Sequence, residues 1–129
     1  MFKITRAAEY AILLLISLEK NQGKLLSLNK IAKKKALPLK FLEKIASQLK
    51  KEGILSSKEG VGGGYYLNKP VEKITLFEIL RAIEGKKGLV SCIHGDCALE
   101  KCCDHRKVWE RLQKKISNEF KKIKLNDLV

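Results

Sequence analysis

Hydrophobic residues in the first half of the chain recur at helical intervals and predict three helices. Residues 5–20 carry alanine and leucine around most of the helix circumference, which is typical of a helix buried on nearly all sides. A short second helix follows Ser27, a residue suited to the N-cap. The third begins at Pro38, whose fixed φ suits a first helical position, and Gly53 ends it. Its single apolar stripe consists of Leu42, Ile45, Ala46 and Leu49.

Two short strand candidates follow the third helix and predict a β-hairpin. They span Ile54–Lys58 and Tyr65–Leu67, with a glycine-rich tip between them. Glycine there permits a tight turn or a close backbone approach to another molecule. No Gly-Lys-Ser/Thr follows, and a strand rather than a helix comes next, so the run is neither a P-loop nor a dinucleotide fingerprint. Two helices, a tight turn and a hairpin together predict a winged helix-turn-helix.

Two further helices are predicted in the second half. Thr75 and Glu78 form a capping box for the first of them, and Gly85 ends it. The last helix is expected over Asp104–Lys124, about 30 Å at ~1.5 Å per residue. Its apolar residues recur every three or four positions and are Val108, Leu112, Ile116, Phe120 and Ile123. One small domain cannot cover such a seam, so a second copy of the chain is expected to pair with it.

The predicted fold is mostly α with a small β-hairpin, and the chain of 129 residues divides into three parts. Residues 1–85 form the winged helix-turn-helix DNA-binding domain, 86–103 the cysteine-rich, cluster-binding loop, and 104–129 the dimerisation helix and C-terminal tail. The apolar run Ala11–Leu18 is too short to span a bilayer, and no small residues follow it as a signal peptidase site would require. A cytoplasmic protein without a membrane partner is expected.

The net charge of +13 and a pI near 9.7 favour a polyanionic partner. In a winged helix-turn-helix the second helix of the motif enters the major groove, where lysine, carboxylate and apolar side chains can contact base edges. Leu42, Ile45 and Leu49 are instead expected in the core. Lys33–Lys35, Lys50 and Lys58 are expected to meet phosphate rather than base edges, although any single lysine could equally belong to a solvated helix face. The residues expected to contact DNA are Lys3, Arg6, Lys33, Pro38, Leu39, Lys40, Phe41, Glu43, Lys44, Lys50, Lys58, Gly60, Gly62 and Gly63.

All four cysteines lie within one twelve-residue window, at Cys92, Cys97, Cys102 and Cys103, and His105 follows. In the cytosol such clusters are more often metal ligands or redox groups than disulfides. Thiolates favour an iron–sulfur cluster or zinc, and nearby lysines favour the thiolate form. A structural zinc site and a metal-free thiol switch are the alternatives. Zinc ribbons usually contain paired Cys-x2-Cys motifs, and this chain has none.

Several segments resemble the IscR/NsrR-type (Rrf-two) bacterial transcription regulators over nearly the whole chain. They are Thr5–Ala11 (TRAAEYA), Phe41–Glu43, Leu49–Gly53, the GVGGGY run Gly60–Tyr65, the clustered cysteines and Trp109. The resemblance implies a homodimer that binds a palindromic promoter in double-stranded DNA. In members with three cysteines it also implies an iron–sulfur cluster, 2Fe-2S or 4Fe-4S. The state of that cluster alters DNA affinity in response to iron–sulfur supply, nitric oxide or redox conditions. Neither catalysis nor a small-molecule substrate is expected.

The resemblance also implies three cysteine ligands. Cys92 and Cys97 match the first two directly. Cys103 is preferred as the third because it lies six residues before Trp109, as the register of the family's helix requires. Cys102 is the alternative.

The fourth ligand implied by the resemblance is not a cysteine. His105 is one candidate, because it keeps the family's Cys-x-x-His spacing when it is measured from Cys102. Glu9 is the other, since some relatives place a ligating carboxylate in the first helix; His94 is weaker. The hairpin departs from the family pattern at Glu59, where relatives often carry a basic residue, so minor-groove contact there is in doubt.

Overall fold

Helix α1 (Arg6–Lys20) runs through the middle of the protein in the computed structural model, which describes residues 4–21, 23–85 and 105–129. The Thr5 hydroxyl caps it by accepting a hydrogen bond from the backbone N–H of Ala8 at 3.2 Å. The helix contacts α3, α4 and the hairpin. Its buried side chains are Ala8, Ala11, Leu14, Leu15 and Leu18. The prediction of a helix buried on most sides is confirmed.

The helix-turn-helix consists of α2 (Leu28–Lys35) and α3 (Leu39–Lys51). The Ser27 side chain caps α2, as predicted. The turn between the helices is tight because Ala36 takes a left-handed conformation with φ of 54°. Pro38 occupies the N-cap of α3 rather than the expected first helical position, so that expectation was off by one residue. The predicted stripe of α3 is buried to 0–1% exposure.

The hairpin pairs β1 (Leu55–Lys58) with β2 (Gly64–Leu67) in antiparallel register. A third segment joins it, because Leu26 and Tyr65 exchange two backbone hydrogen bonds of 2.9 and 3.1 Å. The close approach requires glycine at position 64, where an added Cβ would lie 2.8 Å from the backbone of Leu26. The sequence did not predict this third partner of the sheet.

Helix α4 (Leu76–Glu84) follows a short 3₁₀ turn, η1 (Val71–Lys73), and begins with the predicted capping box. Helix α5 (Arg106–Lys122) is shorter than the predicted range, of which Asp104 lies outside the described residues. It ends because the chain turns back to pair with the segment before α4. The backbone N–H of Leu76 donates to Ile123, and that of Leu125 donates to Ile74.

A second 3₁₀ turn, η2 (Leu125–Leu128), closes the described chain and inserts one side chain into the core. Leu125 is 0% exposed and belongs to the same cluster as the buried residues of α1 and α3. The C-terminal end of the chain is thereby attached to the helix-turn-helix unit.

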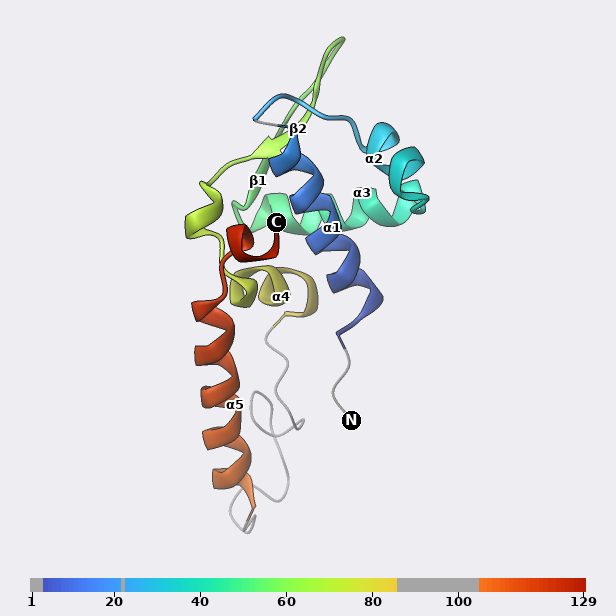
Figure 1. Cartoon of the computed structure of the whole chain (residues 1–129). Coiled ribbons are helices and arrows are strands. Elements are labelled where there is room, and N and C mark those ends of the chain that lie inside the picture. Colours follow the sequence, from blue (N-terminus) through green and yellow to red (C-terminus); the bar gives the residue numbers. More distant parts are fainter. Residues whose placement is uncertain (1–3, 22, 86–104) are drawn as a thin grey trace.

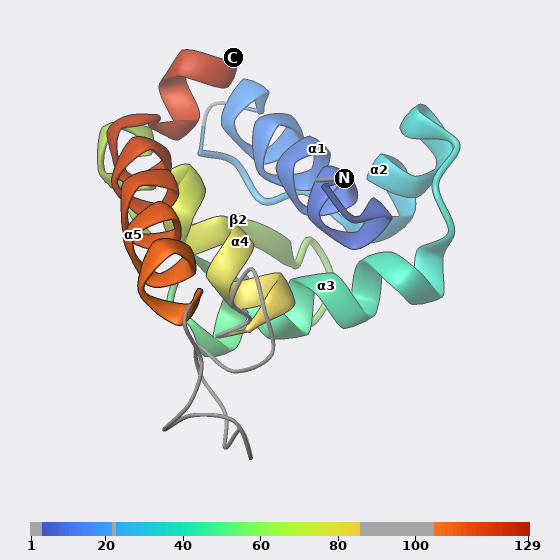
Figure 2. The same cartoon turned by 90° about the horizontal axis from the view of Figure 1, so that it is seen from below.

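The hairpin and α5 extend from this core in opposite directions (Figure 1). Viewed from below, α5 and α2 lie at opposite sides of the molecule, with α4 between α5 and α3 (Figure 2). Among the described helices, none combines the length and the hydropathy that crossing a membrane would require.

Candidate nucleic-acid interface and cysteine segment

The outward face of α3 is polar and exposed along its whole length. Because the apolar stripe points into the core, residues three or four positions apart on the other side share one solvent-facing surface. Lys40, Glu43 and Lys44, all predicted to contact DNA, lie on it and are exposed. Ser47 continues the same face and is exposed too. Sequence reasoning missed Ser47, although its spacing of three from Lys44 would have identified it.

Two other predicted DNA contacts in the first turn of α3 pack against the protein itself. Leu39 and Phe41 are half-buried and lie against the core. The Phe41 ring meets Tyr10 of α1 edge to face, with centroids 5.4 Å apart and an interplanar angle of 83°. The structure gives both residues a packing role, and their contact with DNA stays a prediction.

The hairpin is connected to α3 by a hydrogen bond between side chains. The Lys50 ammonium donates to the Ser57 hydroxyl of β1 at 2.7 Å. Lys58, at the end of β1, is exposed and points from the same hairpin. The hydrogen bond places Lys50 against β1, whereas Lys58 follows Ser57 in a strand, where successive side chains point to opposite faces. Contact of either lysine with DNA stays a prediction.

The glycines of the hairpin tip meet requirements of the turn. Gly60 and Gly62 have φ of +96° and +77°, which side chains other than hydrogen rarely permit. A Cβ on Gly63 would overlap the Lys58 carbonyl oxygen. Val61 at the tip is fully exposed, which the sequence pattern did not single out. The tip offers backbone and one apolar side chain to a partner.

The remaining predicted DNA contacts are dispersed. Lys33 and Pro38 are exposed at the end of α2 and the start of α3. Arg6 is exposed in the first turn of α1 and pairs with Glu9 at 3.6 Å. Lys3 lies outside the described residues. Arg6 is therefore held beside a candidate metal ligand.

The four cysteines lie outside the described residues, as does His94, so their predicted roles stay predictions. The structure describes only the two helices that flank this segment in the sequence. Helix α4 ends at Gly85, α5 begins at Arg106, and these two helices contact each other. In the described ranges no three potential metal-ligating side chains come together.

His105, a candidate fourth ligand, is the N-cap of α5 and already has a partner. Its Nδ1 accepts a hydrogen bond of 2.8 Å from the indole N–H of Trp109, and the two rings lie at 84°. Since Nδ1 is the acceptor, the neutral imidazole carries its hydrogen on Nε2. A metal bound at Nδ1 would displace Trp109, and a metal bound at Nε2 would require the hydrogen to move to Nδ1, which breaks the same hydrogen bond. His105 must therefore release Trp109 before either nitrogen can bind a metal.

Glu84 was not singled out in the sequence. It is the last residue of α4, directly before Gly85 and the cysteine segment. One carboxylate oxygen, Oε1, is buried without a hydrogen-bond partner within the described part of the chain. A buried oxygen of this kind is normally satisfied by hydrogen bonds, so Glu84 offers a further acceptor two residues before the cysteine segment begins in the sequence.

The start of α4 is stabilised by a charged network. Lys69 donates to Glu78 at 2.7 Å, and the carboxylate also accepts from the backbone N–H of Thr75 at 3.0 Å. Partial burial raises the pKa of Glu78, but the hydrogen bonds and the charge of Lys69 together hold that pKa below its ordinary value. Glu78 thus remains ionised and completes the capping box of α4, the helix that contacts α5.

The predicted apolar seam on α5 is exposed at its N-terminal end and half-buried nearer the core. No residue of α5 is buried; Val108 is 49% and Leu112 is 38% exposed. Ile116, Phe120 and Ile123, nearer the core, are half-buried. Helix α4 contacts α5, and near the end of α5 the Lys121 ammonium lies 4.7 Å from the centre of the Phe77 ring.

Comparisons with known proteins agree with this architecture. Residues 4–129 match the family described as Rrf2, iron-dependent transcriptional regulator. The transcriptional regulator IscR of Klebsiella pneumoniae is 30% identical over 98% of this chain and 79% of its own length. CymR, the global cysteine regulator of B. subtilis, superposes with a TM-score of 0.76 at 29% identity, covering 99% of this chain and 96% of CymR. For T. potens IscR the TM-score is 0.70 at 26% identity, covering 98% and 85%.

Proposed function

The chain belongs to the Rrf2 family of transcriptional regulators, and from this premise we propose that it is a DNA-binding regulator whose cysteine segment senses iron–sulfur status, nitric oxide or redox state. Its relatives are regulators rather than enzymes. The proposed units are the predicted ones: a DNA-binding unit over 1–85, a cluster-binding segment over 86–103 and a dimerisation unit over 104–129.

One observation carries the DNA-binding part of the proposal: α3 has a fully buried apolar stripe beneath an entirely polar exposed face. The core therefore fixes the orientation of Lys40, Glu43 and Lys44, and no further folding is needed to present them. In the major groove, lysine can donate to guanine and a carboxylate can accept from cytosine. The Lys50–Ser57 hydrogen bond supports a hairpin that binds beside α3 along the phosphate backbone.

The donor set of the cysteine segment fits an iron–sulfur cluster. Four thiols in twelve residues provide the soft ligands that such clusters take, and the family description names iron dependence. Cys92, Cys97 and Cys103 would hold the cluster, with Cys102 as the alternative third ligand and His105 or Glu9 as the fourth. When bound, the cluster would supply a centre whose redox state and integrity change with its surroundings.

The contacts at both ends of the segment support a route from sensor to DNA. The segment begins at α4 and ends at α5, and Leu125 beyond α5 packs into the core shared with α3. A change in the segment would shift α5 against α4 and thereby alter the position of the DNA-binding unit. Allosteric coupling requires such an element, which both sites can bias.

The uncovered seam of α5 supports a homodimer. Two copies that pair through Val108 and Leu112 would set the separation of their two α3 helices. A palindromic promoter requires half-sites about one turn of DNA apart, roughly 34 Å. The dimer would therefore convert a movement of α5 into a change of DNA affinity.

The test is to purify the protein without oxygen and to measure its visible spectrum, iron, sulfide and zinc. A brown protein that contains iron and sulfide, and loses both in Cys92→Ala/Cys97→Ala, is expected. Ser57→Ala, outside the cysteine segment, is the control that should keep the colour. A full visible spectrum in the double variant would refute the ligand assignment.

A second candidate is a regulator without a cluster, acting constitutively, through zinc or as a thiol switch. The similarity to the Staphylococcus aureus regulator CymR, solved in an oxidized form, favours a thiol switch; its TM-score is 0.71 at 29% identity. The hydrogen bond that His105 Nδ1 accepts from Trp109 also argues against His105 as the fourth ligand. A colourless protein that carries zinc, or whose DNA affinity changes with thiol oxidation alone, would establish this alternative.

A further inference from the structure

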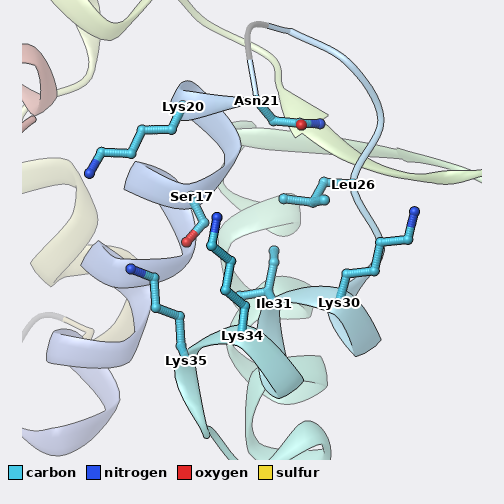
Figure 3. A pocket seen from close by; sticks show the side chains of 8 residues that line it. All are labelled: Ser17, Lys20, Asn21, Leu26, Lys30, Ile31, Lys34 and Lys35. Atoms are coloured by element: carbon cyan, nitrogen blue, oxygen red, sulfur yellow. The ribbon is translucent and has the colours of Figure 1, made fainter.

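A cavity of about 130 Å³ lies between the C-terminal half of α1 and one side of α2 (Figure 3). Its wall is completed by the segment that joins these helices. The residues that line it are Ser17, Lys20, Asn21, Leu26, Lys30, Ile31, Lys34 and Lys35. Half of the lining side chains are lysines, which come from two different helices.

The four lysines have no acidic partner in the described part of the chain. None of the residues that line the cavity is acidic either. In Figure 3 the ammonium group of Lys34 lies beside Ser17, those of Lys20 and Lys35 lie to its left, and Lys30 extends in the opposite direction, beyond Ile31. All four lysine side chains are exposed. Like charges gathered around one cavity repel one another, and a bound anion removes that repulsion.

The neutral polar groups of the cavity have already used their donors. The Ser17 hydroxyl donates to the Leu13 carbonyl at 2.8 Å, and the Asn21 amide donates to the carbonyls of Lys24 and Leu25. The donors that remain for a ligand are therefore the ammonium groups. A site of this kind recognises charge density rather than the shape of a planar group.

The cavity shares no residue with the surface formed by α3 and the hairpin, since no residue of α3 or of the strands lines it. Of the three α2 lysines predicted to meet DNA phosphate, Lys34 and Lys35 line the cavity and Lys33 does not. Helix C-termini attract lysine through their partial negative charge, which accounts for a cation at each helix end. It does not account for four cations from two helices around one cavity, and Lys30 lies in the first turn of α2.

We propose that this cavity binds a phosphate group, as a second anion site distinct from the α3 surface. Phosphate is compact and multiply charged, and lysine binds it as a point charge without requiring a fixed donor geometry. A phosphate held between Lys20 of α1 and Lys34 of α2 would cross-link the two helices. The phosphate has two potential sources: a free phosphate-bearing small molecule, or the backbone of DNA that extends past the α3 surface.

The first experiment titrates inorganic phosphate and pyrophosphate into the full chain without DNA, at constant ionic strength set by chloride. Binding is followed by the thermal midpoint and by phosphorus NMR. Lys34→Gln/Lys35→Gln should weaken pyrophosphate binding by about tenfold or more, since it removes two charge-assisted contacts. Lys73→Gln/Lys114→Gln removes the same charge from exposed positions elsewhere and should leave binding unchanged. Lys20→Gln/Lys30→Gln tests the other two sides of the cavity.

The second experiment measures how DNA affinity depends on salt for the same variants, and only this arm rests on the proposed function. A slope reduced by roughly one for each lost phosphate contact in the Lys34→Gln/Lys35→Gln variant, but not in the control, identifies DNA as the source. Phosphate binding with an unchanged DNA slope identifies a free ligand. Two results together overturn the proposal. The first is that pyrophosphate binds both double variants equally or binds neither. The second is that the salt slope of DNA binding is unchanged or that DNA is not bound.

Discussion

Helices α3 and α5 each carry one apolar stripe and one polar face, yet the structure uses the two helices in opposite ways. The stripe of α3 is buried to 0–1% exposure, and its polar face points to solvent. No residue of α5 is buried, and Val108 and Leu112 are 49% and 38% exposed. The exposed surface of α3 is thus charged, and the exposed surface of α5 is partly apolar.

This difference indicates which partner each helix can take. A charged face above a rigid core suits a polyanion, because its side chains keep their hydration until they meet opposite charge. An apolar seam on a projecting helix suits another protein surface, where its burial contributes roughly 25 cal/mol per Å². The same amphipathic pattern therefore presents a charged face in α3, which we propose meets DNA, and an apolar face in α5, which we propose meets a second copy of the chain.

The largest effect is expected in the core below α3. Leu42→Ala should lower the free energy of unfolding by about 2–5 kcal/mol, because Leu42 is 0% exposed and its removal leaves a cavity. Chemical denaturation measures this loss. Leu112→Ala, at a concentration where the chain is monomeric, should lower it by less than about 1 kcal/mol. Equal losses would mean that the seam of α5 is buried within the monomer.

The seam itself is tested by Leu112→Glu. Placing a carboxylate in a paired apolar seam should weaken self-association by about 2 kcal/mol or more, or roughly thirtyfold. Sedimentation equilibrium gives the dissociation constant directly. Asn118→Glu, which adds the same charge at an exposed position of the same helix, is the control. A dimer that tolerates Leu112→Glu as well as it tolerates the control must use another surface.

The polar face of α3 is tested by Lys44→Ala. Its loss should weaken binding to a specific DNA site by about 1–3 kcal/mol if Lys44 contacts a base. If it contacts phosphate, binding should weaken on all sequences, with a salt slope smaller by about one per half-site. Fluorescence anisotropy at several salt concentrations distinguishes these cases. Lys114→Ala on α5 should have no effect, and an equal loss there would contradict the assignment of the two faces.

A smaller effect is expected at the start of α4, the helix between the two regions. The pKa of Glu78 is lowered in the folded protein, so its stabilising contribution is present above the pKa of the unfolded chain. That contribution is lost as pH falls through the folded pKa. Glu78→Gln should therefore destabilise the protein at neutral pH by no more than about 1 kcal/mol, since the ion pair is partly exposed.

Denaturation of wild type and Glu78→Gln across acidic pH measures this difference, which should shrink as pH falls. Glu72→Gln, an exposed carboxylate in the preceding turn, should show no such trend. A gap between wild type and Glu78→Gln that widens toward acid pH would reverse the sign and disprove the assigned role of Lys69.

The smallest effect concerns the turn that sets the approach of α3. Ala36 has φ of 54°, where a Cβ costs about 1–2 kcal/mol, and glycine removes that cost at an entropic penalty of roughly 0.5–1 kcal/mol. Ala36→Gly should therefore raise stability by about 0.5 kcal/mol in thermal or chemical unfolding. Ala46→Gly, inside α3, should lower stability by about 1 kcal/mol or more. Destabilisation by both changes would show that the turn carries no such strain.

Features that depend on residues close together in the sequence could be predicted from the sequence alone. The caps at Ser27 and Thr75, the buried stripe of α3 and the glycine tip of the hairpin were all predicted. Each arises from contacts within about four residues or from a periodicity that one helix imposes. The cysteine spacing and the net charge were equally visible, and they carry the chemistry of the proposed sensor.

Only the tertiary structure decided which surfaces the protein leaves free. It places Leu26 beside Tyr65, Phe41 against Tyr10, and Leu125 in the core, although these partners are far apart in sequence. It also gathers the four lysines of the α1–α2 cavity from two helices.

An apolar stripe looks the same in a sequence whether it is covered or not, because coverage depends on elements that pack from elsewhere in the chain. The sequence predicted a core stripe for α3 and an uncovered seam for α5, but it did not predict how far the core covers that seam. The structure leaves Val108 and Leu112 exposed and half-buries Ile116 and Phe120, because only the C-terminal end of α5 lies near the core.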